Sequence, residues 1–332
     1  MSADSLFGGS DSSALSAGSL ALLNQFLTDT VGGSTSSESI GGSTYISGTG
    51  SHGETQGGVL PTSGAINGTI DDGVFQLTLN LPANTGLVFE GMNGATPDAA
   101  GVFLKSLLDS YHPSAVQQAS LVSAVNQLVD AMKAQGVTNV EFRLFDVISN
   151  SGNGALGQPD AALGAGTHDI VLNASQNPGV QAFAVNLSHA TDALVLKGVE
   201  YALVANAGTV RVEDSSPIRL VGDLAAQDIT GGGGNDTLVG GGGNDTLTGG
   251  LGNDVFGFSA LGHVTIKDFD VAHDTAAFSF AGLTNIQQLA ALVTSVDDAP
   301  TGVTFNFGHD ASITLVGVSA AQITADFIKF TF

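Results

Sequence analysis

The chain has 332 residues, which corresponds to about two domains at ~150 residues each. Eight Lys and Arg residues oppose 31 Asp and Glu residues, giving a net charge of −23. This composition excludes a nucleic-acid-binding protein, which needs cations for phosphate contacts, and disfavours adsorption to anionic lipid. The absence of Cys excludes disulfides and thiolate metal sites. We expect no membrane span, because no segment approaches ~18 consecutive apolar residues.

Residues 1–70 form a Ser/Gly-rich N-terminal arm with 14 Gly and 15 Ser. Such a composition is typical of a flexible extracellular linker. The arm also carries more large apolar side chains than a linker needs, so a second interpretation is an assembly segment that orders against another subunit. These side chains are Leu20, Leu22, Leu23, Phe26, Leu27, Ile40, Tyr45 and Ile46.

Residues 71–150 are predicted to be a small α+β domain with the element order ββααβ. Alternating apolar and polar residues predict strands at 75–81 and 140–144, and a third short strand covers 87–89. Pro97 begins the first helix. Ser114 and Gln117 have the spacing of a capping box at the start of the second helix.

Residues 168–280 are predicted to be a β-solenoid, because short β-rich runs recur every ~8–12 residues with Gly, Asn or Asp between them. Residues 231–257 within it are three nonapeptides of the form G-G-x-G-x-D-x-U-x. Glycines permit tight turns with positive φ, and carboxylate and carbonyl oxygens are the ligands that calcium prefers. The large apolar residue of each repeat is expected to point inward from a short strand.

These nonapeptides resemble the RTX (repeats-in-toxin) family of calcium-binding proteins, which are exported by type I secretion. The resemblance implies a mainly β fold, with a parallel β-roll or β-solenoid in the C-terminal half, and Ca²⁺ bound in its turns. The implied metal-binding residues are Gly231, Gly233, Asn235, Asp236, Gly240, Gly242, Asn244, Asp245, Gly249, Leu251, Asn253 and Asp254.

In that family two nonapeptides make one coil, so turns at the same edge are two repeats apart. Asp236 and Asp254 are then expected to lie at one edge with a calcium ion between their turns. Asp245 is expected at the other edge, where the residues two repeats away in either direction are not aspartates. The resemblance therefore implies one well-formed calcium site and one or two weak ones, and residues 222–230 look like a degenerate preceding repeat.

The C-terminal part extends the resemblance. Asp268, Asp270 and Asp274 look like the acidic segment that closes such rolls and often adds a calcium site. Residues 281–332 are expected to be a C-terminal cap that ends in a type I secretion signal. Since Asp4 and Asp11 stand where a cleaved N-terminal signal carries cations, we expect export to use the C-terminal signal instead.

We expect no enzymatic activity. The chain contains neither the H-E-x-x-H motif of metalloproteases nor the G-x-S-x-G motif of serine hydrolases, which argues against both classes of enzyme. Its seven His are scattered, and three of them directly precede an Asp. Neighbouring residues on a strand face opposite sides, so those pairs make poor catalytic dyads.

The composition, rich in Gly, Ser, Thr and Ala and low in charge, resembles that of self-assembling surface-layer and biofilm-matrix proteins. Together with the RTX resemblance, it implies a secreted, calcium-stabilised structural protein that self-assembles into a surface layer, sheet, fibre or biofilm matrix. Its expected location is extracellular or on the cell surface of a Gram-negative bacterium, and its expected partners are copies of itself and the type I secretion machinery. One alternative is a carbohydrate-binding or adhesin module that binds cell-surface polysaccharide. A hydrolase with an unrecognised site is less favoured.

Overall fold

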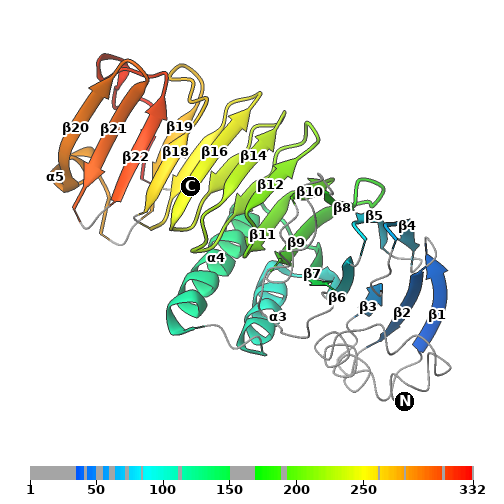
Figure 1. Cartoon of the computed structure of the whole chain (residues 1–332). Coiled ribbons are helices and arrows are strands. Elements are labelled where there is room, and N and C mark those ends of the chain that lie inside the picture. The colour runs from blue at the N-terminus through cyan, green and yellow to red at the C-terminus, as the bar shows by residue number, and fades with distance from the viewer. Residues whose placement is uncertain are drawn as a thin grey trace.

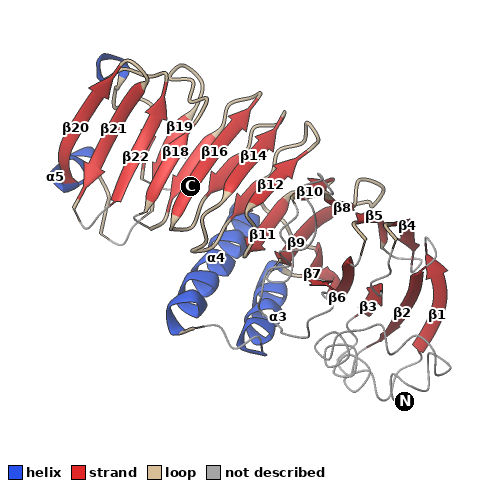
Figure 2. Cartoon of the chain, in the orientation of Figure 1, coloured by secondary structure: helices blue, strands red, loops and turns tan. Residues whose placement is uncertain are grey.

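The strands of the protein stack side by side in two long sheets, and a pair of helices lies against one of them (Figure 1). The structure, a computed structural model, describes residues 35–40, 43–49, 55–59, 64–71, 75–83, 85–110, 114–149, 169–187, 193–260, 262–279, 282–308 and 311–330. Strands dominate these residues (Figure 2).

The first sheet contains twelve strands among the described residues. In spatial order they are β1 (Thr35–Ile40), β2 (Ser43–Thr49), β3 (Thr55–Val59), β6 (Thr85–Ala95), β7 (Val140–Ser149), β9 (Val180–Asn186), β11 (Tyr201–Ala205), β13 (Arg219–Val221), β15 (Thr237–Val239), β17 (Val255–Phe258), β19 (Thr275–Phe278) and β23 (Ile328–Lys329).

The second sheet contains eleven strands within the same described ranges. In spatial order they are β20 (Val293–Ala299), β21 (Gly302–Phe307), β22 (Ala311–Val316), β18 (His263–Ile266), β16 (Asn244–Gly250), β14 (Asp228–Gly232), β12 (Thr209–Val212), β10 (Leu194–Lys197), β8 (Ile170–Asn173), β5 (Gln76–Leu81) and β4 (Ile66–Asp71).

From β8 to β19 the chain alternates between the two sheets, and each strand pairs in parallel with the strand one coil later. In the repeats one coil is two nonapeptides, since Thr237 pairs with Val255 and Asp228 pairs with Thr246. A parallel β-roll is therefore confirmed. The eighth residues of the nonapeptides, Leu238, Leu247 and Phe256, are 0% exposed, so they point into the core between the sheets.

The strands before the roll extend both sheets in antiparallel pairings. β3 pairs with β6 and β4 pairs with β5, so the described part of the N-terminal arm is built into the sheets of its own chain. The apolar segment Leu20–Leu27 lies outside the described residues. The elements of the expected ββααβ unit are present, but β5 belongs to the second sheet and β6 and β7 to the first.

The two long helices cover the first sheet. α3 (Pro97–Ser110) and α4 (Ala115–Ala134) contact β7 and β11, and α4 begins with the expected capping box of Ser114 and Gln117. Beneath them lies a core cluster that includes Leu203, Val221 and Val239. The described residues contain no helix long and apolar enough to cross a membrane.

The C-terminal segment closes the end of the roll. α5 (Ile286–Leu292), the hairpin β20–β21 and a short 3₁₀ helix, η2 (Ala320–Gln322), lie there. The Phe327 ring packs against Phe269 with ring centroids 5.2 Å apart, and β23 pairs with β19. This segment is therefore part of the core.

Because the two long helices cover only the first sheet, the ninth residues of the first two nonapeptides differ in burial. Val239 is 0% exposed, whereas the equivalent Thr248 lies half-buried on the outer face of the second sheet. We expect Val239→Thr to lower the free energy of unfolding by about 1–3 kcal/mol, because it buries a hydroxyl without a partner. The matched variant Thr248→Val should change it by less than about 0.5 kcal/mol. Urea unfolding at fixed calcium concentration measures both, and equal losses would contradict the arrangement.

Candidate calcium-binding turns

The turns of successive coils lie above one another at two edges of the roll. The structure places Asp236 and Asp254 at the first edge and Asp245 at the second. Turns at the first edge lead from the second sheet to the first and cover 213–218, 232–236, 250–254 and 267–274. Turns at the second edge cover 206–208, 222–227, 240–243 and 259–262, with residue 261 outside the described residues.

The aspartates of the repeats join each coil to the coil before it. Asp236 Oδ1 accepts a hydrogen bond from the Ile218 amide at 3.0 Å. Asp254 Oδ1 accepts one from the Asp236 amide at 2.8 Å, and Asp245 Oδ1 one from the Gln227 amide at 3.1 Å. Each carboxylate thus satisfies a backbone donor in the turn of the preceding coil, which fixes the stacking of the turns.

The second carboxylate oxygen of two of these residues has no hydrogen-bond partner. Asp236 and Asp245 are 0% and 2% exposed, and in both the Oδ2 atom is buried without a partner. An unpartnered, buried carboxylate oxygen is unfavourable unless a proton or a cation compensates its charge. The environment of Asp245 therefore matches that of Asp236, although the repeat spacing predicts a weaker site there.

Glycine at the first place of each nonapeptide leaves room around these oxygens. A Cβ added at Gly231 would lie 2.5 Å from Asp236 Oδ2. The corresponding distances are 2.3 Å from Gly240 to Asp245 Oδ2 and 2.2 Å from Gly249 to Asp254 Oδ2. Any side chain at these places would displace the carboxylate, so the glycines are required by its position.

Backbone carbonyls supply further oxygen atoms. A Cβ added at Gly250 would lie 2.0 Å from the Gly232 oxygen, and one added at Gly252 would lie 2.0 Å from the Gly234 oxygen. Both glycines have positive φ, at 103° and 131°. Calcium takes six to eight oxygen ligands, and these turns combine one carboxylate with several carbonyls. The described residues accordingly contain no cluster of three or more His or acidic side chains around one point.

Burial shifts the titration of these carboxyl groups. Desolvation, together with the charge of Asp254, raises the pKa of Asp236 to about 7. Desolvation, with the charge of Asp223, raises the pKa of Asp245 to about 7. The pKa of Asp254 is raised to about 6, again chiefly by desolvation. A divalent cation would reverse these shifts by stabilising the ionised form.

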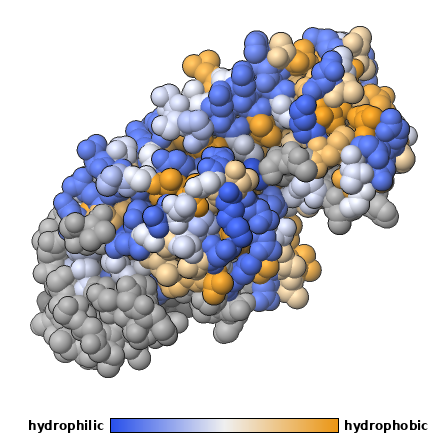
Figure 3. Space-filling model, turned by 180° about the vertical axis from the view of Figure 1, so that it is seen from behind, coloured by the Kyte–Doolittle hydropathy of each residue, from blue (hydrophilic) through white to orange (hydrophobic). Residues whose placement is uncertain are grey.

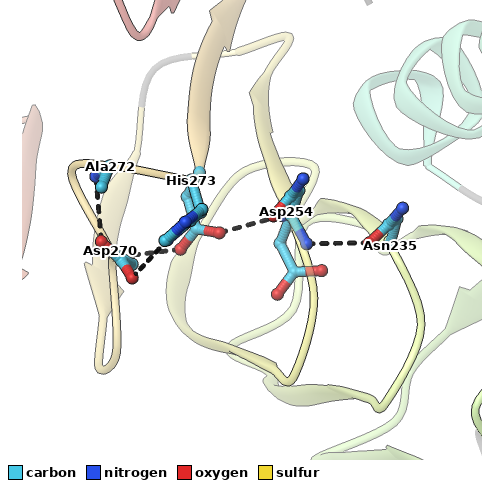
Figure 4. Close-up of polar contacts among 7 residues, drawn as sticks. Asn235, Asp254, Asp270, Ala272 and His273 are labelled. Carbon is cyan, nitrogen blue, oxygen red and sulfur yellow. Dashed lines mark hydrogen bonds and ion pairs between the residues drawn. The ribbon is translucent and has the colours of Figure 1, made fainter.

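The predicted C-terminal acidic segment, with Asp268, Asp270 and Asp274, forms hydrogen bonds with the last turns of the repeats (Figure 4). Asp268 Oδ1 and Oδ2 accept hydrogen bonds from the Gly249 and Gly250 amides, both at 2.9 Å. Asp274 Oδ1 accepts one from the Asp254 amide at 2.9 Å. Its other oxygen accepts one from the Asp270 amide at 2.8 Å. A calcium-ligating role for these three residues stays a prediction.

Asp270 also holds its own loop. Its carboxylate accepts a hydrogen bond from the Ala272 amide at 2.9 Å and contacts His273 Nδ1 at 2.8 Å (Figure 4). These contacts lower the pKa of Asp270, with the His273 hydrogen bond as the largest cause, and raise that of His273.

The other predicted residues lie within the same turns. Asn235 Oδ1 accepts a hydrogen bond from the Asn253 amide at 2.9 Å, which links two coils at the first edge. The Leu251 side chain is 76% exposed, so only its backbone faces the turn. Asn244 begins β16 at the second edge, beyond the turn that contains Gly242. Gly233 donates its amide hydrogen to the Asp214 carbonyl at 3.0 Å.

Two aspartates of these edges are missing from the sequence-based prediction. Asp214 precedes Asp236, and Asp223 precedes Asp245, by more than the length of two nonapeptides. These two aspartates therefore fall outside the period of the repeats. Each accepts a hydrogen bond from the amide two residues ahead, at 3.0 Å, and one from the preceding coil. Asp itself favours such an Asx turn, but the residues around Asp214 and Asp223 share no further motif that would have revealed them.

The fold and the turns define a parallel β-roll with oxygen-rich, calcium-binding turns. Residues 221–256 match the family model of the RTX calcium-binding nonapeptide repeat, in four copies. The protein is therefore an RTX calcium-binding protein, and Ca²⁺ is the ion its repeats bind. The match includes all of residues 222–230, the segment whose sequence looks degenerate. Repeats of this family are typical of secreted, extracellular proteins.

Two solved structures are similar to parts of the chain. The AlgE6R3 subunit of the Azotobacter vinelandii mannuronan C5-epimerase is 30% identical, over 36% of this chain and 80% of that one, with a TM-score of 0.23. The extracellular lipase LipA from Serratia marcescens is 18% identical, over 46% of this chain and 37% of that one, with a TM-score of 0.24. No curated protein matches the chain.

The raised pKa values predict how calcium-free stability depends on pH. Asp236 and Asp245 have a pKa of about 7 when folded, whereas unfolded Asp has a pKa of about 3.9. The folded state binds more protons between these values, so this contribution is present below about pH 4 and lost as the pH rises through 7. In chelator, the melting temperature should therefore be higher at about pH 5 than at about pH 8.

Calcium should abolish or reverse this trend, because the ion replaces the protons and competes with them. Thermal melts followed by circular dichroism, at each of the two pH values and with chelator or millimolar calcium, give the four melting temperatures to compare. The double variant Asp236→Asn/Asp245→Asn separates these groups from general acidic repulsion and should lose most of the trend. A higher calcium-free melting temperature at pH 8 than at pH 5 would contradict the assignment.

The glycine beside each carboxylate provides a second test. Gly249→Ala places a Cβ 2.2 Å from Asp254 Oδ2, so it should weaken calcium binding by about 10-fold or more. Gly208→Ala is the matched control, because no atom lies within 4 Å of a Cβ added there. Isothermal titration calorimetry compares the two. Equal affinities would show that the Asp254 carboxylate does not hold the ion.

Proposed function

We propose that the protein is a secreted, non-enzymatic structural protein that calcium folds and that then self-assembles outside the cell. The calcium-binding repeats support the first part. The free energy of calcium binding to such turns contributes to the free energy of folding. The roll should therefore stay unfolded where calcium is scarce and fold where its concentration is millimolar.

The observation that carries the assembly proposal is the outer face of the second sheet. Across seven neighbouring strands, from β12 to β20, the register aligns one side chain per strand into a continuous row. The helices lie over the other sheet, which leaves this face free of them (Figure 1). The row consists of Thr209, Asp228, Thr246, Thr265, Thr314, Thr304 and Asp297.

This face is close to neutral in a chain of net charge −23. Lys267 pairs with Asp228 at 3.3 Å, Lys197 pairs with Glu213 at 3.0 Å, and Arg211 pairs with Asp169. Three of the eight cations of the chain thus offset acidic groups on or beside one sheet. A second copy can approach there without the repulsion that the rest of the surface would impose.

The size of the face is sufficient for a stable contact. Seven strands at ~4.8 Å spacing span about 29 Å, and strands of about six residues span about 20 Å. Two copies would therefore bury roughly 1,200 Å², which exceeds the ~1,000 Å² expected of a specific interface. Seen from the side opposite to that of Figure 1, the molecule shows hydrophobic residues at the end that carries β20–β22 (Figure 3).

Electron microscopy of the pure chain, with and without calcium, tests this function. We expect ordered sheets or fibres in calcium only. Thr265 lies in the middle of the row, so Thr265→Glu should abolish or strongly reduce them by burying an unpaired charge. Val116→Glu adds the same charge on the helix layer, where Val116 is 70% exposed, and should assemble normally.

Monodisperse wild-type particles in calcium would overturn the proposal. If such particles bound soluble polysaccharide, the carbohydrate-binding alternative would replace it. Assembly lost in Val116→Glu and kept in Thr265→Glu would move the interface from the sheet to the helices. A circular dichroism melt in calcium shows that both variants are folded.

A further inference from the structure

The outer face of the second sheet cannot by itself build an extended sheet or fibre. When the same surface of two copies meets, the contact is isologous and closes after two copies. Extended assembly therefore needs a second contact elsewhere on the chain. The end of the molecule that carries β20 has the properties of such a contact (Figure 1).

β20 is an open edge strand. It is the last strand of the second sheet, and within the described residues its backbone pairs with β21 alone. Residues 294–299 of this strand are all exposed. The outer edge of such a strand carries N–H and C=O groups that can pair with a strand of another chain.

The second sheet also extends past the first sheet at this end. β22 pairs with β18 and β23 pairs with β19, but the first sheet ends at β23 whereas the second continues through β21 to β20. The register places Val296 beside Phe305 and Ile313, on the side of the sheet that faces the core. Ile313 is 7% exposed, but Val296 is 46% exposed. The core is thus incomplete at its last strand.

The sequence of β20 is compatible with pairing to itself. Val296 is the middle residue of the strand, so a second copy that pairs antiparallel about Val296 aligns the whole of β20. In that register Asp297 lies opposite Ser295 of the second copy, and Asp298 lies opposite Thr294 of the second copy. No two carboxylates then face each other directly, which matters because directly opposed like charges destabilise a strand pair.

The acidic residues of the strand are held by their own chain. Charged side chains often protect an edge strand from pairing. Here Asp297 Oδ2 accepts a hydrogen bond from Asn306 Nδ2 at 2.7 Å, and Asp298 Oδ1 accepts one from the Ala320 amide at 3.1 Å. Ser295 Oγ accepts one from Asn306 Nδ2 at 3.0 Å, so the Ser295 hydroxyl can still donate its hydrogen to Asp297 of the second copy.

We propose that β20 pairs with β20 of a second copy, antiparallel and centred on Val296, so that the second sheets of the two copies become one continuous sheet. The two Val296 side chains then lie together on the inward face and cover apolar surface that each separate core leaves exposed. This inference rests on the proposed self-assembly and adds its second contact. Copies that pair through the outer face and through β20 form a polymer that neither contact forms alone.

A cysteine at the centre of the strand tests the pairing, because the chain contains no Cys. Opposite residues of an antiparallel pair have Cβ atoms about 4.5–5.5 Å apart, within reach of a disulfide after a small adjustment. Thr294 points to the same side as Val296, but it would lie about 14 Å from Thr294 of the second copy. Val296→Cys and Thr294→Cys are therefore matched variants.

Both cysteine variants are made in the Thr265→Glu background, which is expected to block the contact through the outer face. After oxidation in calcium, a non-reducing gel should show the disulfide-linked dimer as the main product of Val296→Cys and mostly monomer for Thr294→Cys. Equal cross-linking of the two variants, or no cross-linking of Val296→Cys, would refute the pairing. This result does not depend on whether the outer face assembles.

A charge at the same position tests the role of the pairing in the polymer. In the otherwise wild-type chain, Val296→Lys places two like charges opposite each other, so electron microscopy in calcium should show particles no larger than a face-paired dimer. Val102→Lys makes the same change at a 70% exposed position of α3 and should assemble like the wild type. Sheets or fibres that persist in Val296→Lys would count against the proposal. If the wild-type chain forms no extended assembly, the proposed function fails, and the cross-linking alone decides the pairing of β20.

Discussion

The fold depends on one repeated contact, a side-chain carboxylate that accepts a backbone amide hydrogen from the preceding coil. The contact begins before the repeats, where Glu200 accepts the Gln181 amide at 2.7 Å. It continues through Asp223 and Asp236 to Asp274. A hydrogen bond to a charged group contributes about 1.5–3 kcal/mol, which is large for a contact made once per turn. It also brings negative charge into each edge, so the repeats become both well stacked and dependent on a cation.

The roll itself could be predicted from the sequence, because its information is local. Each nonapeptide specifies a turn, one inward-pointing residue and the repeat period. Leu238, Leu247 and Phe256 are buried, as that period predicts. The aspartate edges follow from the same spacing. The likeness of Asp245 to Asp236 does not, since it depends on burial by a neighbouring turn, which no single repeat specifies.

What the sequence could not show is how distant segments share the sheets. β5 pairs with β8 although both long helices lie between them in the chain, and β18 pairs with β22 across α5 and the hairpin β20–β21. The alternation of apolar and polar residues predicts each of these strands, but it does not indicate which other strand each one pairs with. The burial of Val239 has the same cause, because α4 covers that part of the first sheet and leaves the equivalent Thr248 on the open face of the second.

The short period of the repeats has a kinetic consequence. Neighbouring strands of the repeats are separated by only two nonapeptides along the chain, whereas β7 meets β9 across a longer segment that contains β8. Contacts between nearby residues form faster, because less chain entropy is lost in closing the loop. We therefore expect the repeats to fold first once calcium arrives. The hydrogen-bonding edges they expose would then be a template on which the slower, more distant strands add in turn, outward from the centre of the molecule.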